Sequence, residues 1–175
     1  MIVEAKRRGE GFTGAKITRY ASPVSEHLRV PKRRVPVEVA LAGHAARPAE
    51  VFLAETSANA NRPERLSDLL DGATSFVPVL EDGHAALLGR SSLLWVSVDN
   101  GVLEDDELEL FSHRKKVSLD LRDGSKLEGE LLYTAPMESA RVADFLNGHD
   151  RCFRVWQASR TYFVIKEHVL RVVED

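Results

Sequence analysis

Two arginine–aspartate pairs have the spacing that best fits a defined contact. Arg65 precedes Asp68 by three residues, and Arg141 precedes Asp144 by the same interval. Residues at i and i+3 lie on one face of a helix, where a guanidinium and a carboxylate can form an ion pair. Such a pair can hold a helix against the rest of a fold, or it can contact a ligand or partner. The spacing alone is compatible with both roles.

Two further basic side chains occupy corresponding places in the chain. Arg90 and Lys166 each lie near the end of an apolar segment that predicts a strand. One interpretation is a solvated charge at a strand end, and the other is a contact to a ligand or partner. A third basic group lies near the N-terminus and comprises Arg29, Lys32, Arg33 and Arg34.

Residue patterns typical of enzymes and metal sites are missing from the sequence. The six histidines are scattered singly, and neither a P-loop nor a G-x-S-x-G motif occurs. Cys152 is the single cysteine, which excludes an internal disulfide and a cysteine-based metal site, and its apolar neighbours predict a buried side chain. We therefore expect no catalytic residues, no cofactor and no metal.

The elements that must position these residues occur twice. Residues 65–72 align with residues 141–148 at an offset of 76, and this offset holds to the end of each copy. Upstream, residues 37–41 align with residues 117–121 at an offset of 80. The difference of four residues falls in the polar segment 56–61, where a loop can change length at little cost. The chain is therefore an internal duplication.

Each copy predicts the same series of elements. Alternating apolar and polar residues predict strands, and Pro or Ser near the start of a segment with Gly at its end predicts a short helix. The expected strands are 37–41, 51–53, 76–80, 84–90 and 93–98, then 117–121, 131–133, 152–157, 161–166 and 168–173. The expected helices are 63–72 and 139–148, with Ser139 as an N-cap, and Asp123-Gly124 predicts a tight turn.

This pattern divides the chain into four parts. We expect an extended or partly disordered basic arm at 1–34, a first β-barrel repeat at 35–98, an acidic linker at 99–115 and a second repeat at 116–175. A unit of about 60 residues is small for an independent core. The two copies are therefore expected to pack together as an intramolecular pseudo-dimer with approximate two-fold symmetry.

Charge is distributed unevenly along the chain. Residues 1–34 contain nine Lys or Arg and three Glu, a net charge of +6, while the remaining residues contain 15 basic and 24 acidic side chains, a net charge of −9. The acidic body argues against a protein that binds a polyanion over its whole surface. No apolar run is long enough to cross a bilayer and no secretory signal precedes the body, so we expect a cytoplasmic protein.

The second copy resembles the Sm-like (LSm) proteins. Residues 117–129, VSLDLRDGSKLEG, match the first Sm motif, and residues 164–172, VIKEHVLRV, are similar to the second motif of the bacterial RNA chaperone of this class. The resemblance covers both copies and implies two tandem small β-barrels, mainly β with one short inserted helix each. It also implies that Arg90 and Lys166 face a nucleotide pocket between subunits. Asp144 and Asn147 depart from the family, because they occur later than its RNA-contacting pair.

A second resemblance is confined to the basic arm. Arg29 and Arg33 fit the R-x-x-x-R motif of PilZ domains, which bind cyclic di-GMP, but residues 55–60 match the companion motif poorly. We therefore expect a non-enzymatic binding or assembly module that acts through protein–protein contacts or self-association. The alternatives are an RNA-binding Sm-like protein and a degenerate PilZ-like sensor.

Overall fold

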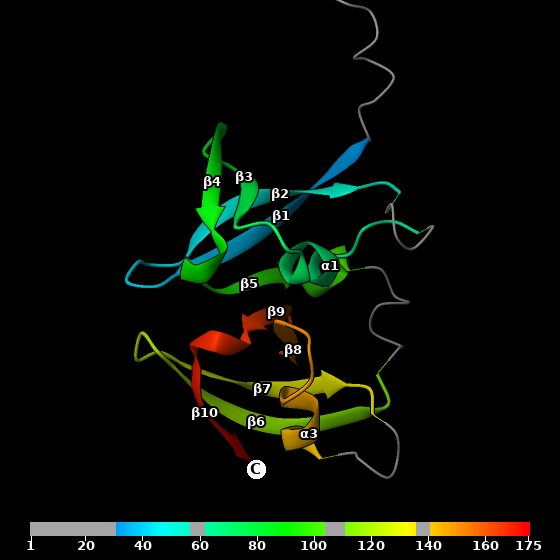
Figure 1. The fold of residues 1–175 in the computed structure, drawn as a ribbon, viewed down its shortest axis with the longest axis vertical. Helices are drawn as coiled ribbons and strands as arrows, with labels where there is room; N and C mark the ends of the chain where they lie inside the picture. The colour runs from blue at the N-terminus through cyan, green and yellow to red at the C-terminus, as the bar shows by residue number, and fades with distance from the viewer. Residues whose placement is uncertain (1–30, 57–61, 104–110, 136–140) are drawn as a thin grey trace, which may run out of the picture.

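A computed structural model describes residues 31–56, 62–103, 111–135 and 141–175, and Figure 1 shows their arrangement. The first copy contains β1 (Lys32–Leu41), β2 (Arg47–Ala54), α1 (Leu66–Asp71), β3 (Phe76–Glu81), β4 (His84–Gly89) and β5 (Leu93–Asp99). The second contains β6 (His113–Leu121), β7 (Lys126–Tyr133), α3 (Val142–Leu146), β8 (Cys152–Trp156), β9 (Arg160–Ile165) and β10 (Val169–Glu174). The prediction of a mainly β chain with one short helix in each copy is confirmed for these residues.

The strands follow from the alternation of side chains. In β1, Val35, Val37 and Val39 are buried, whereas the residues between them are partly or fully exposed. Successive side chains of a strand point to opposite faces, so this pattern turns one face of β1 toward the core. The tight turn predicted at Asp123-Gly124 is also confirmed. Gly124 has φ of +84°, a conformation that favours glycine, and the Asp123 carboxylate accepts a hydrogen bond from the backbone N–H of Ser125.

All described strands belong to one antiparallel sheet of ten, in the order β10-β6-β7-β8-β9-β5-β1-β2-β3-β4. The two copies therefore form two halves of one continuous sheet. They meet where β5 pairs with β9, in a register that places Val96 opposite Phe163 and Asp99 opposite Arg160. We call this contact the junction.

The junction does not have the two-fold symmetry that the duplication suggested. A two-fold axis would pair equivalent strands of the two copies. Instead, the fifth strand of the first copy pairs with the fourth strand of the second, and the strands of both copies follow one another in the same direction across the sheet. The copies are therefore arranged head to tail, and the predicted two-fold is wrong.

Two apolar clusters form the interior, and the first contains residues of both copies. Cys152, Phe163 and Ile165 of the second copy pack among buried side chains of β1, β2, β3 and β5. The second cluster lies around β6, β7 and α3. The first copy therefore needs side chains from its neighbour to complete its core, as its small size requires.

Several boundaries of segments and elements in the structure differ from those predicted from the sequence. The expected arm overlaps β1, which begins at Lys32, and the expected linker overlaps β6, which begins at His113. The helices are shorter than predicted, and Ser139 and the expected arm through residue 30 lie outside the described residues. Within the described part of the chain, no helix is long and apolar enough to span a membrane.

Candidate functional site

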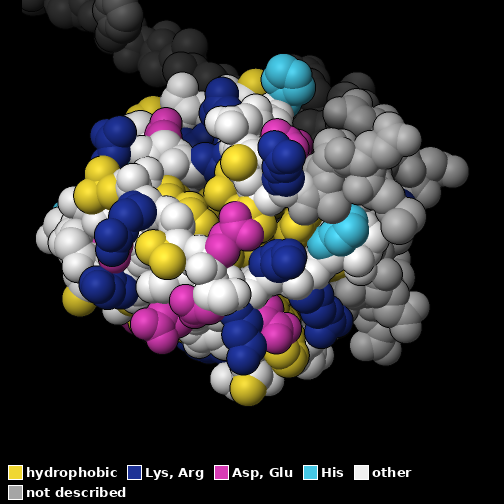
Figure 2. Space-filling view, turned by 90° about the horizontal axis from the view of Figure 1, so that it is seen from below, with side chains coloured by type: hydrophobic (Ala, Val, Ile, Leu, Met, Phe, Trp, Pro, Cys, Tyr) yellow, Lys and Arg dark blue, Asp and Glu magenta, His cyan; other side chains and the backbone are white. Residues whose placement is uncertain are grey.

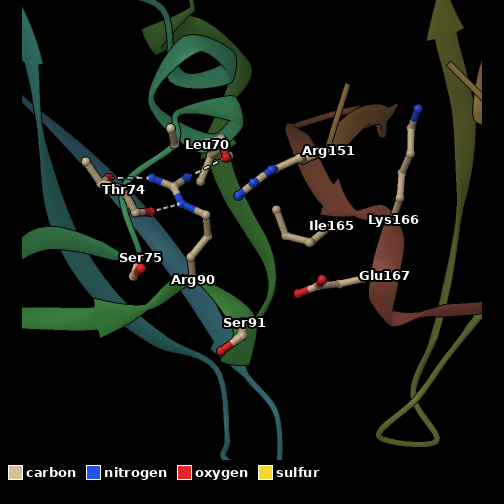
Figure 3. A pocket seen from close by; sticks show the side chains of 10 residues that line it. Leu70, Thr74, Ser75, Arg90, Ser91, Arg151, Ile165, Lys166 and Glu167 are labelled. Carbon is tan, nitrogen blue, oxygen red and sulfur yellow. Dashed lines mark hydrogen bonds between the residues drawn. The ribbon is translucent and has the colours of Figure 1, made fainter. Parts of the chain in front are cut away.

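A cleft of about 490 Å³ lies at the junction between the copies (Figure 3). Thr74, Ser75 and Arg90 line its first-copy wall, and Arg151, Lys166 and Glu167 line the other. In the close-up, Arg151 and Glu167 extend toward the first copy, whereas Lys166 points away from Arg90. The cleft thus contains a cation and a carboxylate from the same wall.

Arg90 is buried and its guanidinium closes the end of α1. Its Nε donates a hydrogen bond to the Thr74 carbonyl at 2.6 Å, and its Nη2 donates to Thr74 Oγ1 at 3.0 Å. Its Nη1 donates to the carbonyls of Leu69 at 2.9 Å and Leu70. These carbonyls belong to the last turn of a helix and lack partners within the helix itself. The interpretation of Arg90 as a solvated strand-end charge is therefore wrong.

Lys166 performs the same task in the second copy. Its ammonium group donates to the Gly148 carbonyl at 3.1 Å, at the end of α3, and lies 5.5 Å from the centre of the Phe145 ring. Lys166 is more exposed than Arg90 and makes fewer hydrogen bonds. The corresponding positions therefore share a structural role, in which a cation after the fourth strand neutralises the carbonyl end of the inserted helix.

Asp68 anchors the beginning of α1. Its carboxylate accepts hydrogen bonds from Arg62, at 2.7 and 3.1 Å, and from the backbone N–H of Arg65, the N-cap residue, at 2.9 Å. Partial burial acts to raise the pKa of Asp68, but the hydrogen bonds from Arg62 and Arg65 outweigh it, so the pKa is lowered. Asp68 thus serves as a charged cap in the first copy.

The second predicted pair is arranged differently. Arg141 is the N-cap residue of α3 and Asp144 lies in its first turn, and both side chains are exposed. None of Arg65, Asp68, Arg141 and Asp144 lines the junction cleft. The structure therefore places neither predicted pair in the wall of the junction cleft.

The predicted basic arm does not form one basic surface in the described residues. Lys32, Arg33 and Arg34 belong to β1, and Arg34 lies 3.6 Å from the Glu50 carboxylate and 5.9 Å from the centre of the Phe52 ring. Arg29 lies outside the described residues.

Figure 2 shows the face below β6 and β10 of Figure 1, where basic and acidic side chains are interspersed. That face therefore lacks a continuous area of positive charge to which a polyanion could bind.

Polar contacts across the junction were missed by the sequence interpretation. The Asp71 carboxylate of α1 accepts hydrogen bonds from the backbone N–H groups of Arg151 at 2.8 Å and Cys152 at 3.1 Å. Arg160 on β9 donates to Asp99 on β5 at 3.0 Å and to Glu38 on β1. No local spacing could identify these pairs, because Asp99 and Arg160 are 61 positions apart.

Cys152 is buried in the first core cluster at the junction. Burial raises the pKa of its thiol far above the ordinary value, and the Asp71 carboxylate acts in the same direction. Because the thiolate is the reactive form, we expect native Cys152 to react with a thiol reagent at least about 1000-fold more slowly than in denaturant, since reaction requires the core to open. Colour release from an aromatic disulfide reagent measures both rates. Complete labelling of the native protein within the mixing time would contradict this assignment.

The two edges of the sheet are a second candidate site. Among the described strands, β4 pairs only with β3, and β10 pairs only with β6. Four large apolar side chains with high exposure lie on or beside these edges: Phe76 (55%), Leu87 (68%), Leu170 (65%) and Val173 (39%). An exposed apolar edge is a template for pairing with another strand.

A hollow of about 210 Å³ lies beside β10. Apolar side chains make up most of its wall, namely Leu146, Phe153, Val169, Leu170 and Val172. The second core cluster reaches this hollow through Phe153, while Leu146, Val169 and Val172 are only partly buried. The second copy therefore has an apolar hollow on its surface on the side of β10.

Comparisons with protein families, curated proteins and solved structures find no match for this chain. Among the residues that the structure describes, no three His, Cys, Asp or Glu side chains are grouped as metal ligands would be. The candidate sites in the described residues are therefore the junction cleft and the two edges of the sheet.

Proposed function

We propose that this protein is a non-enzymatic module that acts through protein–protein contacts, made by the β4 and β10 edges of its sheet. The supporting observation is the concentration of exposed apolar side chains at those edges, including Leu87 and Leu170. Proteins that remain monomeric usually blunt a sheet edge with charge, proline or a covering element. An apolar edge that is left open is typical of an interaction site.

The proposed architecture of each copy is a small, degenerate Sm-like unit. The segment that resembles the first Sm motif folds as β6 and β7 with a turn at Gly124. Its last glycine, Gly129, lies where the backbone at the end of β8 comes close to β7, so a side chain would not fit there. These features support the resemblance and carry no functional conclusion by themselves.

RNA binding at the junction cleft is the second candidate function. The observation that favours it is the Arg151 side chain, which extends into a cleft between the copies that is large enough for a base. Glu167 opposes it, because a carboxylate on the same wall repels phosphate. Arg90 directs its Nη1 group to carbonyls of α1, and its Nε and Nη2 groups to Thr74. We therefore place the protein-binding function first.

Affinity capture tests the proposed function. We would immobilise the wild-type chain, a double variant with Leu87→Glu and Leu170→Glu, and a Val102→Glu control, and identify the proteins that each retains from the cells that produce it. Val102 is an exposed large apolar residue away from both edges, in the short helical turn Asn100–Val102. Partners should be retained by the wild type and the control and lost by the double variant. An identical set on all three would contradict the proposal, whereas material removed only by nuclease would favour RNA.

A further inference from the structure

We propose that the junction cleft binds a small zwitterion, namely a free amino acid with an apolar side chain. The carboxylate of this ligand would lie between the guanidinium groups of Arg151 and Arg90, and its ammonium group would lie against Glu167. The inference concerns the cleft rather than the edges of the sheet, so it is independent of the protein-binding function proposed above. It follows from the charges in the cleft, from the donors and acceptors that are available there and from the apolar part of the lining.

Arg151 supplies a positive charge that the protein itself leaves unpaired. Its backbone N–H donates to the Asp71 carboxylate at 2.8 Å, which holds the residue at the start of β8, while its side chain extends toward Arg90 (Figure 3). Within the described part of the chain, the Arg151 guanidinium has neither a hydrogen bond nor an ion pair. A guanidinium presents a planar pair of donors that matches the two oxygens of a carboxylate.

Arg90 adds a second guanidinium on the opposite wall of the cleft. A guanidinium has five N–H groups, and Arg90 makes four hydrogen bonds in the described structure, which leaves one N–H on Nη2. Burial lowers the pKa of Arg90, and the positive charge of Arg151 acts in the same direction. The Asp71 carboxylate opposes this effect, but it already accepts two backbone N–H groups. A carboxylate bound between the two guanidinium groups would offset their repulsion.

Glu167 implies that the ligand also has a positive group. The residue belongs to the short helical turn Lys166–His168, and its carboxylate extends into the cleft from the same wall as Arg151 (Figure 3). Its Oε1 lies 3.5 Å from Nε2 of His168, and the described residues provide no partner for its other oxygen. A phosphate or another simple anion would place like charges together at this point. A zwitterion instead places an ammonium group there.

The rest of the lining fits an apolar side chain. Leu70, Ala73 and Ile165 contribute apolar surface to the same cleft. The volume of about 490 Å³ lies in the range of small-molecule sites, which are mostly apolar with a few convergent polar groups. Because Arg90 belongs to the first copy and Arg151 and Glu167 to the second, the bound amino acid would contact both copies.

Titration of the full-length chain with L-phenylalanine, and with L-leucine as a second apolar amino acid, tests the proposal. Backbone amide signals of the isotope-labelled protein report both the place and the affinity of binding. The matched probes are phenethylamine, which lacks the carboxylate, hydrocinnamate, which lacks the ammonium group, and uridine monophosphate, which represents a nucleotide. We expect phenylalanine to shift the signals of Ser91, Arg151 and Glu167, with a dissociation constant about tenfold lower than that of either single-charge analogue.

Two variants assign the role of each charge. Arg151→Gln should weaken the binding of phenylalanine about tenfold without weakening that of phenethylamine, which has no carboxylate to lose a contact. Glu167→Gln should weaken phenylalanine to a similar degree without weakening hydrocinnamate. Both side chains are exposed, so neither change should disturb the fold, and thermal unfolding followed by circular dichroism verifies this. Arg122→Gln, which changes an exposed arginine outside the cleft, should bind phenylalanine as the wild type does.

Three results would overturn the proposal. The first is the absence of shifts in the cleft with both amino acids at about 20 mM, a concentration that populates even millimolar complexes. The second is equal affinity for phenylalanine and hydrocinnamate, or phenylalanine binding that neither variant weakens. The third is tighter binding of uridine monophosphate at the same signals, which would indicate a nucleotide site. None of these results bears on the edges of the sheet, because the capture of partners tests that function separately.

Discussion

Replacing Arg90 with alanine is expected to lower the free energy of unfolding by about 3 kcal/mol. Hydrogen bonds to a charged group contribute about 1.5–3 kcal/mol, and buried groups left without a partner cost about as much again. The guanidinium donates to the carbonyls of Leu69, Leu70 and Thr74 in a site that excludes most water. Its removal leaves the end of α1 without these donors. Urea denaturation followed by circular dichroism measures the change.

Lys166→Ala provides the matched control for Arg90→Ala. It removes the equivalent cation from the end of α3, at a more exposed site with weaker contacts, so we expect a loss of about 1 kcal/mol or less. Arg90→Lys should be intermediate, because one ammonium group cannot reproduce the fork of a guanidinium. Equal effects of Arg90→Ala and Lys166→Ala would contradict the structural role assigned to Arg90.

Replacing Gly129 with valine is expected to destabilise the protein by about 3 kcal/mol or more, because forcing extra atoms into a packed site shifts the backbone. A Cβ at this position would lie 2.6 Å from the Trp156 carbonyl oxygen and 2.7 Å from Val155 Cγ1. The carbonyl cannot move away freely, because Glu130 and Trp156 are partners in the pairing of β7 with β8. Thermal unfolding should show a lower midpoint, and Gly129→Ala should show a smaller shift in the same direction.

Gly101→Ala separates this steric effect from the general effect of removing a glycine. A Cβ at Gly101 meets no atom within 4 Å, and the residue does not have a positive φ. We expect its stability to change by less than about 0.5 kcal/mol. If Gly129→Val were as mild as Gly101→Ala, the close approach of β7 to β8 would be incorrect.

The strands were predictable because their signal is local and occurs twice. Alternation marks which face of β1 or β6 is buried, and the offset of 76 assigns the same element to 84–90 and 161–166. Alternation does not say which strand lies beside which. Both a two-fold arrangement and a head-to-tail arrangement bury the same apolar faces, so the duplication alone could not distinguish them.

The site was less predictable than the fold, for a related reason. The correspondence of Arg90 with Lys166 was visible in the sequence, but the carbonyl groups that they bind are backbone atoms, which any residue supplies. Asp71 likewise contacts two backbone N–H groups that lie 80 and 81 positions away. Only the arrangement of the two halves of the sheet reveals such contacts.

The covalent link between the copies makes the chain, rather than the single copy, the unit of any assembly. Copies can be added only in twos, so an assembly with an odd number of copies is inaccessible to this protein. The β5–β9 junction lies within one chain, so its occupancy does not depend on concentration, whereas any contact between chains follows mass action. Dilution would therefore separate chains from one another and leave the two copies of each chain paired.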